Sequence, residues 1–271
     1  MDERPIAVLG ATGRTGSRVA RALTARGAPV RPLSRNGTGR ERADMRDPSS
    51  LTHALEGCRA VFVVCPGFAQ DEAEMIAAAA RAAAEVGLDR IVLSSVIHPH
   101  TSTMAHHVRK ADGEEAVRDC GVPWTVLQPA MFAQSVTGLF AHLGGDEHDV
   151  VIAWDPTRRL SALDLTDLAE VAATCLLDDG HEYATYELAG PEALSATTMV
   201  EQLAAVTGRP YRVLPVEPGA VAPPGMGEAE KRDFAAMCRE YGTHGLHGNP
   251  RVLEMLLGRP ATTFADAVTP R

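Results

Sequence analysis

The chain has 271 residues, enough for one large core or for a nucleotide-binding domain with a smaller companion. Its formal net charge of −9 argues against a nucleic acid partner, since such proteins concentrate Lys and Arg. Five widely spaced cysteines form no Cys-x-x-Cys pair, which predicts no zinc site or disulfide framework and suits a reducing cytosol. No stretch is long enough to cross a bilayer, so we expect a cytoplasmic protein without a membrane partner.

Short apolar runs alternate with helical patterns through the first half of the chain. We expect strands at Ile6 to Leu9, Pro29 to Leu33, Ala60 to Val64, Arg90 to Leu93 and Trp124 to Leu127. Helices are expected at Ser17 to Ala25, from Leu51 to Leu55, at Glu72 to Val86 and at His106 to Asp119. Strands of four or five apolar residues between helices predict an α/β fold with a doubly wound parallel sheet, covered on both faces.

The pattern loosens after Pro129. We expect a helix at Ala130 to Leu143, a strand at Val150 to Ala153, a helix at Asp164 to Leu177, a strand at Tyr183 to Leu188 and a helix at Ala196 to Thr207. Residues 215–227 are rich in Pro and Gly, which predicts a loop. Two domains are therefore expected: a nucleotide-binding domain at 1–135, with a returning strand near 183–189, and a smaller, partly interleaved domain at 136–271.

The segment GATGRTG lies directly after the first expected strand and opens the first expected helix. Its glycines allow a tight turn, a close approach of the backbone to a pyrophosphate and close packing of helix on strand. The helix N-terminus adds unpaired N–H groups and positive potential. This combination is typical of a Rossmann dinucleotide site, in which the cofactor is bound by Gly10, Ala11, Thr12, Gly13, Arg14, Thr15 and Gly16.

The end of the second strand distinguishes NAD from NADP, because an acid there bonds to the ribose 2′-hydroxyl and repels a 2′-phosphate. Here the strand ends Leu33-Ser34-Arg35, and no acid occupies that position. Arg35 offers a charged fork for the phosphate, with Arg14 as a second cation, so NADP(H) is the expected cofactor. The alternative, that Arg35 is a solvated loop charge, stays open. Asp44 is better placed to reach the adenine end.

With these segments in order, the sequence resembles the NmrA-like branch of the atypical short-chain dehydrogenase/reductases, which includes quinone reductases and azoreductase-like proteins. GATGRTGSRVARAL matches the opening turn of that branch, and the resemblance continues through IVLSSV, KADGEEAVRDCGVPWTVLQPAMFAQS and GRPATTFADAV. The resemblance covers nearly the whole chain. It implies an NADPH-binding Rossmann domain and a smaller C-terminal substrate-binding domain, with a small aromatic or conjugated substrate in the cleft between them.

The resemblance also implies roles for individual residues, carried over by position. Cys65, Pro66 and Gly67 would line the adenosine side of the cofactor. The floor near the nicotinamide would be formed by Ser94 and Ser95, and Lys110 would bind the nicotinamide ribose. The nicotinamide face would be covered by the segment that contains Pro129, Met131 and Phe132.

The catalytic pair is where the sequence departs from short-chain dehydrogenases, which usually hold Tyr-x-x-x-Lys with the tyrosine as proton shuttle. This sequence has His106-x-x-x-Lys110, and its four tyrosines all lie in the second half. One hypothesis is that His106, or its neighbour His107, donates the proton, since imidazole titrates near neutral pH. The alternative is that both histidines are polar residues at a helix start. Lys110 is interpreted as a binding residue, or as a base if it is desolvated.

The sequence shows no motif for metal-dependent catalysis or for a serine hydrolase. The histidines lack the spacing of a His-Glu-x-x-His metal site, so no metal is expected, and a Gly-x-Ser-x-Gly elbow is missing. Two functions stay open: an NADPH-dependent reductase of a quinone, enone or aromatic carbonyl, and a non-catalytic NADP(H)-binding redox sensor that reports to a protein partner. A homodimer also stays open, because the alanine-rich segment Glu72 to Val86 suits a partner's helix as well as its own sheet.

Overall fold

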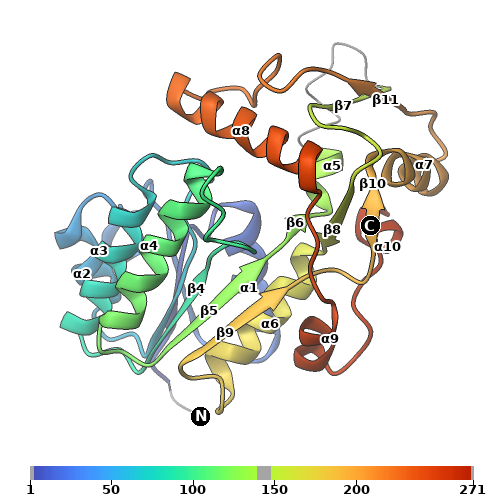
Figure 1. The fold of residues 1–271 in the computed structure, drawn as a ribbon. Coiled ribbons are helices and arrows are strands. Elements are labelled where there is room, and N and C mark those ends of the chain that lie inside the picture. Colours follow the sequence, from blue (N-terminus) through green and yellow to red (C-terminus); the bar gives the residue numbers. More distant parts are fainter. Residues whose placement is uncertain (1–2, 139–147, 270–271) are drawn as a thin grey trace. The chain divides into compact units, whose positions relative to one another are not determined.

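The computed structural model describes residues 3–138 and 148–269 (Figure 1). The chain divides into two compact units, each made of several segments. The first unit comprises Met1–His100, His106–Gln128 and Leu168–Tyr186, and the second comprises Thr101–Ala105, Pro129–Asp167 and Glu187–Arg271. The chain therefore passes between the units more than once.

A six-stranded sheet forms the centre of the first unit (Figure 1). Its order is β2 (Val30–Leu33), β1 (Ile6–Leu9), β3 (Ala60–Val63), β4 (Arg90–Ser94), β5 (Trp124–Pro129) and β9 (Ala184–Leu188). The pairs from β2 through β5 are parallel, with Ile6 opposite both Val30 and Ala60. The order reverses beside β1, where the chain steps first to β2 and later to β3, and ligands of such sheets bind at the carboxyl ends beside this point.

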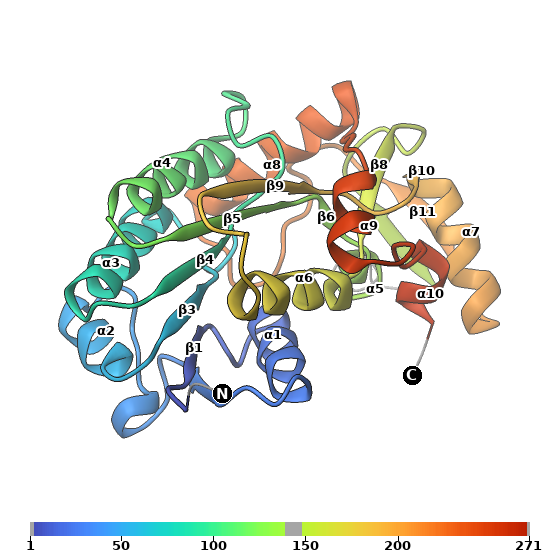
Figure 2. The same cartoon turned by 90° about the horizontal axis from the view of Figure 1, so that it is seen from below.

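Helices cover both faces of this sheet, as Figures 1 and 2 show. One face carries α2 (Pro48–Leu55), α3 (Glu72–Glu85) and α4 (Ala105–Asp119), and the other carries α1 (Arg14–Ala25) and α6 (Leu165–Leu177). A short 3-10 turn, Gly39–Glu41, lies between β2 and α2. The expected α/β class with a doubly wound parallel sheet is confirmed.

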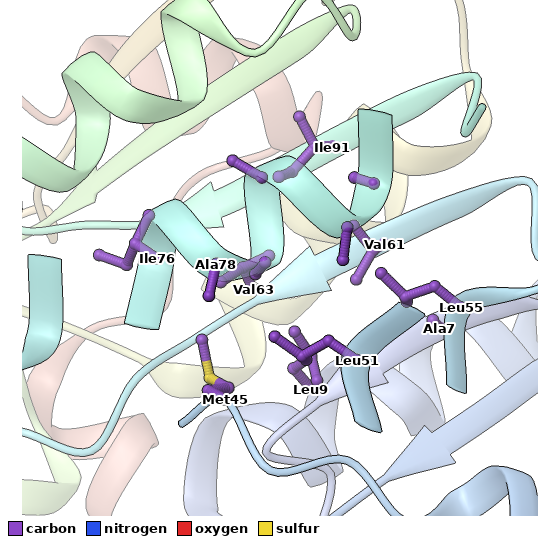
Figure 3. Packing of buried hydrophobic residues seen from close by; sticks show 14 of the residues in the cluster. Ala7, Leu9, Met45, Leu51, Leu55, Val61, Val63, Ile76, Ala78 and Ile91 are labelled. Atoms are coloured by element: carbon purple, nitrogen blue, oxygen red, sulfur yellow. The ribbon is translucent and has the colours of Figure 1, made fainter. Parts of the chain in front are cut away.

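The core under α2 and α3 is built from alternate residues of the strands (Figure 3). Side chains alternate across a strand, so Leu9 and Val63 face this cluster while Val8 and Phe62, also fully buried, face the other side. Helix α3 buries five alanines in or beside this core: Ala78, Ala79, Ala80, Ala82 and Ala83. These alanines pack within the chain itself, so this face of α3 is not available to the homodimer that the sequence left open.

The second unit contains two small sheets. Strand β8 (Arg159–Leu163) lies between β10 (Ala193–Ser195) and β6 (Met131–Phe132), and β7 (Asp149–Ile152) pairs with β11 (Arg212–Pro215). Its helices are α5 (Gln134–Gly138), α7 (Ala196–Thr207), α8 (Glu228–His244), α9 (Arg251–Leu257) and α10 (Phe264–Val268). Neither α8 nor β8 has a counterpart among the sequence-based expectations.

The helix expected at Ala130 to Leu143 is wrong in its first part. Met131 and Phe132 form strand β6 instead, because they pair in parallel with Ala162 and Leu163 of β8. A helix begins only at Gln134, and residues 139–143 lie outside the described part of the chain. Within the described ranges, no helix combines the length and the apolar character that a membrane span requires.

Candidate functional site

The glycine turn joins β1 to α1 as the sequence predicts. Gly10 has a φ of +69°, a left-handed conformation that favours glycine, and its carbonyl accepts a hydrogen bond of 2.8 Å from the Gly13 amide. A Cβ atom at Gly16 would overlap the carbonyl oxygen of Gly10, so only glycine fits there. The turn is held to the end of β2 by the Ala11 amide, 3.1 Å from the Leu33 carbonyl oxygen.

The N-terminus of α1 is suited to an anion. Its N-cap residue, Gly13, makes no side-chain capping bond, and the first turn holds no acidic residue. Thr12, Gly13 and Arg14 are all exposed. Unpaired amides at a helix start attract phosphate groups because the helix dipole is positive there. This turn therefore has the geometry of a pyrophosphate cradle.

The loop after β2 closes on itself and leaves Arg35 at the surface. The Ser34 amide donates to the Glu41 carbonyl at 3.0 Å, and the Ser34 carbonyl accepts from Ala43 at 3.0 Å. Arg35 is exposed between these bonds. One carboxylate oxygen of Asp44 accepts a hydrogen bond of 3.0 Å from the Arg46 amide, so this oxygen stabilises the local turn.

The loop after β3 carries a strained residue. Cys65 is half-buried, with its Sγ atom 4.0 Å from the sulfur of Met45, and burial raises the pKa of its thiol to about 12. Pro66 and Gly67 are exposed, whereas Phe68 adopts a φ of +64°. A left-handed conformation costs a bulky residue energy, and such strain collects at functional sites.

His106 packs against this strained residue. The ring centroids of Phe68 and His106 lie 4.5 Å apart, and His106 is only 6% exposed. Burial, followed by the positive charges of its neighbours, lowers the pKa of His106 to about 2. The imidazole is therefore neutral at physiological pH. Its buried Nδ1 atom finds no hydrogen-bond partner within residues 3–138 and 148–269.

His107 fixes the loop that follows β4. Its ring is fully buried, and its Nδ1 atom lies 3.1 Å from the carbonyl oxygen of His98. A carbonyl oxygen only accepts hydrogen bonds, so the ring carries a proton on Nδ1 and donates it. His98 has a φ of +52°, and this bond helps to hold it there. His107 is thus tied to the β4–α4 connection.

Lys110 forms an ion pair with Glu72, the first residue of α3. The side chain of Lys110 is 12% exposed and that of Glu72 is fully buried. An ammonium has three N–H donors, and Glu72 is its sole partner within the described part of the chain. Two donors are therefore left for a ligand.

A second buried carboxylate, Glu114, lies one helical turn beyond Lys110. It accepts a bond of 2.5 Å from the Ser95 hydroxyl, two bonds of 2.9 and 3.0 Å from Gln128, and an ion pair of 3.3 Å from Arg118. This network ties α4 to the carboxyl ends of β4 and β5. It also commits the hydroxyl of Ser95, while Ser94 is buried as the last residue of β4.

The first unit thus brings together the glycine turn, the loops after β2, β3 and β4, and the start of α4. Pro129, Met131 and Phe132 belong to the second unit, where Pro129 is buried and the other two are half-buried. The sequence reasoning missed Glu72, Phe68, Glu114 and Gln128. Glu114 had a signal, since His106, Lys110 and Glu114 recur every four residues along one helix face. Among the described residues, no group of three or more metal-binding side chains occurs.

The comparisons with known proteins agree over nearly the whole chain. The model of the NmrA-like family matches residues 2–266. A (4-alkanoyl-5-oxo-2,5-dihydrofuran-3-yl)methyl phosphate reductase from Streptomyces griseus is 34% identical, covering 96% of this chain and 95% of its own. An NAD(P)H azoreductase from Xenophilus azovorans is 31% identical, covering 96% of both chains.

Among solved structures, the NADPH-dependent quinone oxidoreductase of Escherichia coli in complex with NADPH is similar in fold. It aligns with a TM-score of 0.76 at 23% identity, covering 97% of this chain and 98% of that one. On the match of the family model and on the two reductases that are more than 30% identical, this chain belongs to the NmrA-like family.

Proposed function

We propose that this chain is an NADPH-dependent reductase of a conjugated small molecule, such as a quinone, an enone or an aromatic carbonyl. The observation that carries the proposal is the turn at Gly10 to Gly16, where the backbone leaves no room for a Cβ atom at Gly16 and leads into a helix start without a side-chain cap. The relatives from S. griseus and X. azovorans are named as reductases, which supports the reaction class.

The residues of the first unit fit each part of this cofactor. The turn from Gly10 to Gly16 binds the pyrophosphate, and exposed Arg35, with Arg14, binds the 2′-phosphate. Lys110 offers its two remaining N–H donors to the hydroxyls of the nicotinamide ribose. When bound, NADPH supplies a hydride, that is, two electrons and one proton, from C4 of its nicotinamide.

The acceptor needs one further proton, and the titrating groups near Lys110 limit where it comes from. His106 is neutral because burial lowers its pKa to about 2, and the Cys65 thiol is a very weak acid because burial raises its pKa to about 12. Lys110 is engaged by Glu72 in an ion pair. We propose that water supplies the proton. This suits quinones and enones, whose hydride adducts are delocalised anions.

The first test measures oxidation of NADPH by the purified protein, monitored by absorbance, with quinones, enones and aromatic ketones offered as acceptors. The affinity for NADPH is measured in parallel. Turnover of at least one class supports the proposal. Tight NADPH binding without any turnover would instead support the redox sensor, and absence of NADPH binding would contradict both functions.

The phosphate end is tested by Arg35→Ala. Loss of a charge-assisted bond is expected to weaken NADPH binding about ten- to a hundredfold and to leave NADH binding within about threefold. Arg81→Ala, an exposed arginine on α3, is the matched control and should bind both cofactors like the wild type. Equal weakening for NADPH and NADH would remove Arg35 from the 2′-phosphate site.

The proton source is tested by His106→Phe and His107→Phe. If water supplies the proton, His106→Phe keeps turnover within about tenfold at saturating NADPH. A loss greater than about a hundredfold in either variant, with NADPH affinity retained, would identify that histidine as the proton donor instead. Because His107 also holds the β4–α4 loop, its variant is compared at equal folded fraction.

A further inference from the structure

The carboxylate of Glu72 is wholly buried but only half used. Its Oε1 atom accepts from the Lys110 ammonium. Its Oε2 atom is buried and has no hydrogen-bond partner in residues 3–138 or 148–269. A buried acceptor without a partner lowers stability, because the group has lost its water and gained nothing in exchange. Such a group calls for an explanation beyond packing.

Glycine at position 113 lets α4 approach α3 closely enough for the pair to form. A Cβ atom at Gly113 of α4 would lie 2.5 Å from the Cδ1 atom of Ile76 and 3.1 Å from its Cβ atom. Ile76 lies one turn after Glu72 on α3, and Gly113 lies three residues after Lys110 on α4. The absence of a side chain here therefore sets the distance that the lysine must reach.

The ion pair lies beside the loop that follows β3. The Cys65 thiol is influenced by the charges of both Lys110 and Glu72. The neighbouring acid, Asp71, is occupied by Arg46 through bonds of 2.5 and 2.8 Å. His106, which packs against Phe68 of this loop, is neutral. Glu72 is thus the group that fixes the position of Lys110, next to a segment expected to line the cofactor.

A purely architectural role explains this pair poorly. Among the described residues, Glu72 accepts no hydrogen bond from the amides at the start of its own helix. An apolar pair of similar volume often stabilises a buried site at least as well as an ion pair does. What an apolar pair lacks is a charged donor held in one place.

We infer that Glu72 is a positioning residue for the cofactor: it holds the Lys110 ammonium so that its two remaining N–H donors meet the hydroxyls of the nicotinamide ribose. This inference rests on the proposed function, because it assigns Lys110 to the ribose of a bound NADPH. Glu72 itself does not touch the cofactor, since both its oxygens are buried. It acts through the lysine.

The test compares three variants by NADPH affinity and by urea unfolding. Glu72→Gln keeps the shape and removes the charge, and it is expected to weaken NADPH binding about tenfold, with KM for NADPH rising more than kcat falls. Lys110→Met should weaken binding at least as much. In the double variant Glu72→Leu with Lys110→Met, stability should recover to that of the wild type or above, while NADPH affinity stays low.

The matched control is Glu85→Gln, the exposed last residue of the same helix, which should keep the affinity of the wild type. Glu72→Asp retains the charge and should recover part of the affinity lost in Glu72→Gln. If wild type binds NADPH but Glu72→Gln or the double variant binds it within twofold, Glu72 is only structural and the inference is overturned. If the wild type binds no NADPH, the proposed function fails instead.

Discussion

Two carboxylates in the same unit, Glu72 and Glu114, are equally hidden from water but differ in how they are satisfied. Glu114 receives bonds from Ser95, Gln128 and Arg118, whereas Glu72 receives one from Lys110. A saturated carboxylate holds its neighbours together and has no capacity left. A half-satisfied one carries a cost that folding alone does not explain. The difference indicates a structural role for Glu114 on α4 and a functional role for Glu72 on α3.

Removing the saturated carboxylate should have the largest effect on stability. In Glu114→Ala, the donors on β4 and β5 and the guanidinium of Arg118 lose their acceptor, so we expect the free energy of unfolding to fall by about 3–5 kcal/mol. Urea unfolding measures this. Glu115→Ala, the exposed neighbour on the same helix, should change it by less than about 0.5 kcal/mol. A loss below about 1 kcal/mol in Glu114→Ala would remove the distinction between the two carboxylates.

A larger residue at position 113 should disturb the ion pair between Glu72 and Lys110. In Gly113→Ala, the added methyl group pushes against Ile76, so α4 moves away from α3 and the Lys110 contact lengthens. We expect a loss of about 1–3 kcal/mol from overpacking and NADPH binding weakened about tenfold. Combining Gly113→Ala with Ile76→Val removes the Cδ1 atom of Ile76, which lies 2.5 Å from the added Cβ atom. The double variant should recover part of the lost stability and part of the lost NADPH affinity. If stability falls and NADPH affinity does not, the spacing between α3 and α4 does not determine how Lys110 binds the cofactor.

The smallest effect concerns His106, which resembles Glu72 in having a buried polar atom without a partner among the described residues. Its pKa is about 2 in the folded protein, against an ordinary value of 6.5 in the unfolded chain, so the unfolded chain binds the proton first. The free energy of unfolding is therefore not reduced by His106 above pH 6.5, where this imidazole is neutral in both states. Below pH 6.5 protonation of the unfolded chain lowers the free energy of unfolding by at most about 1.4 kcal/mol per pH unit.

Urea unfolding at about pH 7.5 and about pH 5.5, on either side of the ordinary histidine pKa, measures this loss. His106→Phe should show a weaker dependence on pH than the wild type, and His53→Ala, a histidine whose side chain is 57% exposed, should show the dependence of the wild type. Identical behaviour of His106→Phe and the wild type would mean that this imidazole titrates normally in the folded protein.

Much of the first unit could be predicted because its signals are local. Apolar runs beside glycine turns and helical patterns indicated the positions of β1, β3 and β4, and the Gly10 to Gly16 spacing predicts the turn from sequence neighbours alone. The strand at Met131–Phe132 could not be predicted in this way, because its pairing partner is at Ala162–Leu163, some thirty residues further along. Apolar periodicity favoured a helix there, and the tertiary pairing overrode it.

The buried charges were beyond sequence reasoning for a related reason. Glu72 stands in the first turn of a helix, where an acid usually faces water and interacts with the helix dipole. Glu114 and Glu115 are identical in type and adjacent, yet one is buried and the other exposed. Which of them meets Ser95 depends on how α4 lies across β4 and β5, and that placement is set by contacts between segments far apart in the chain.

The bond from His107 to the carbonyl of His98 has a spectroscopic consequence. A ring N–H that is fully buried and hydrogen-bonded exchanges slowly with water, so it should give a resolved downfield proton signal in NMR spectra. The signal would come from a single ring position, since the carbonyl fixes the tautomer. The loop between β4 and α4 therefore carries its own reporter, which follows that loop without any added label.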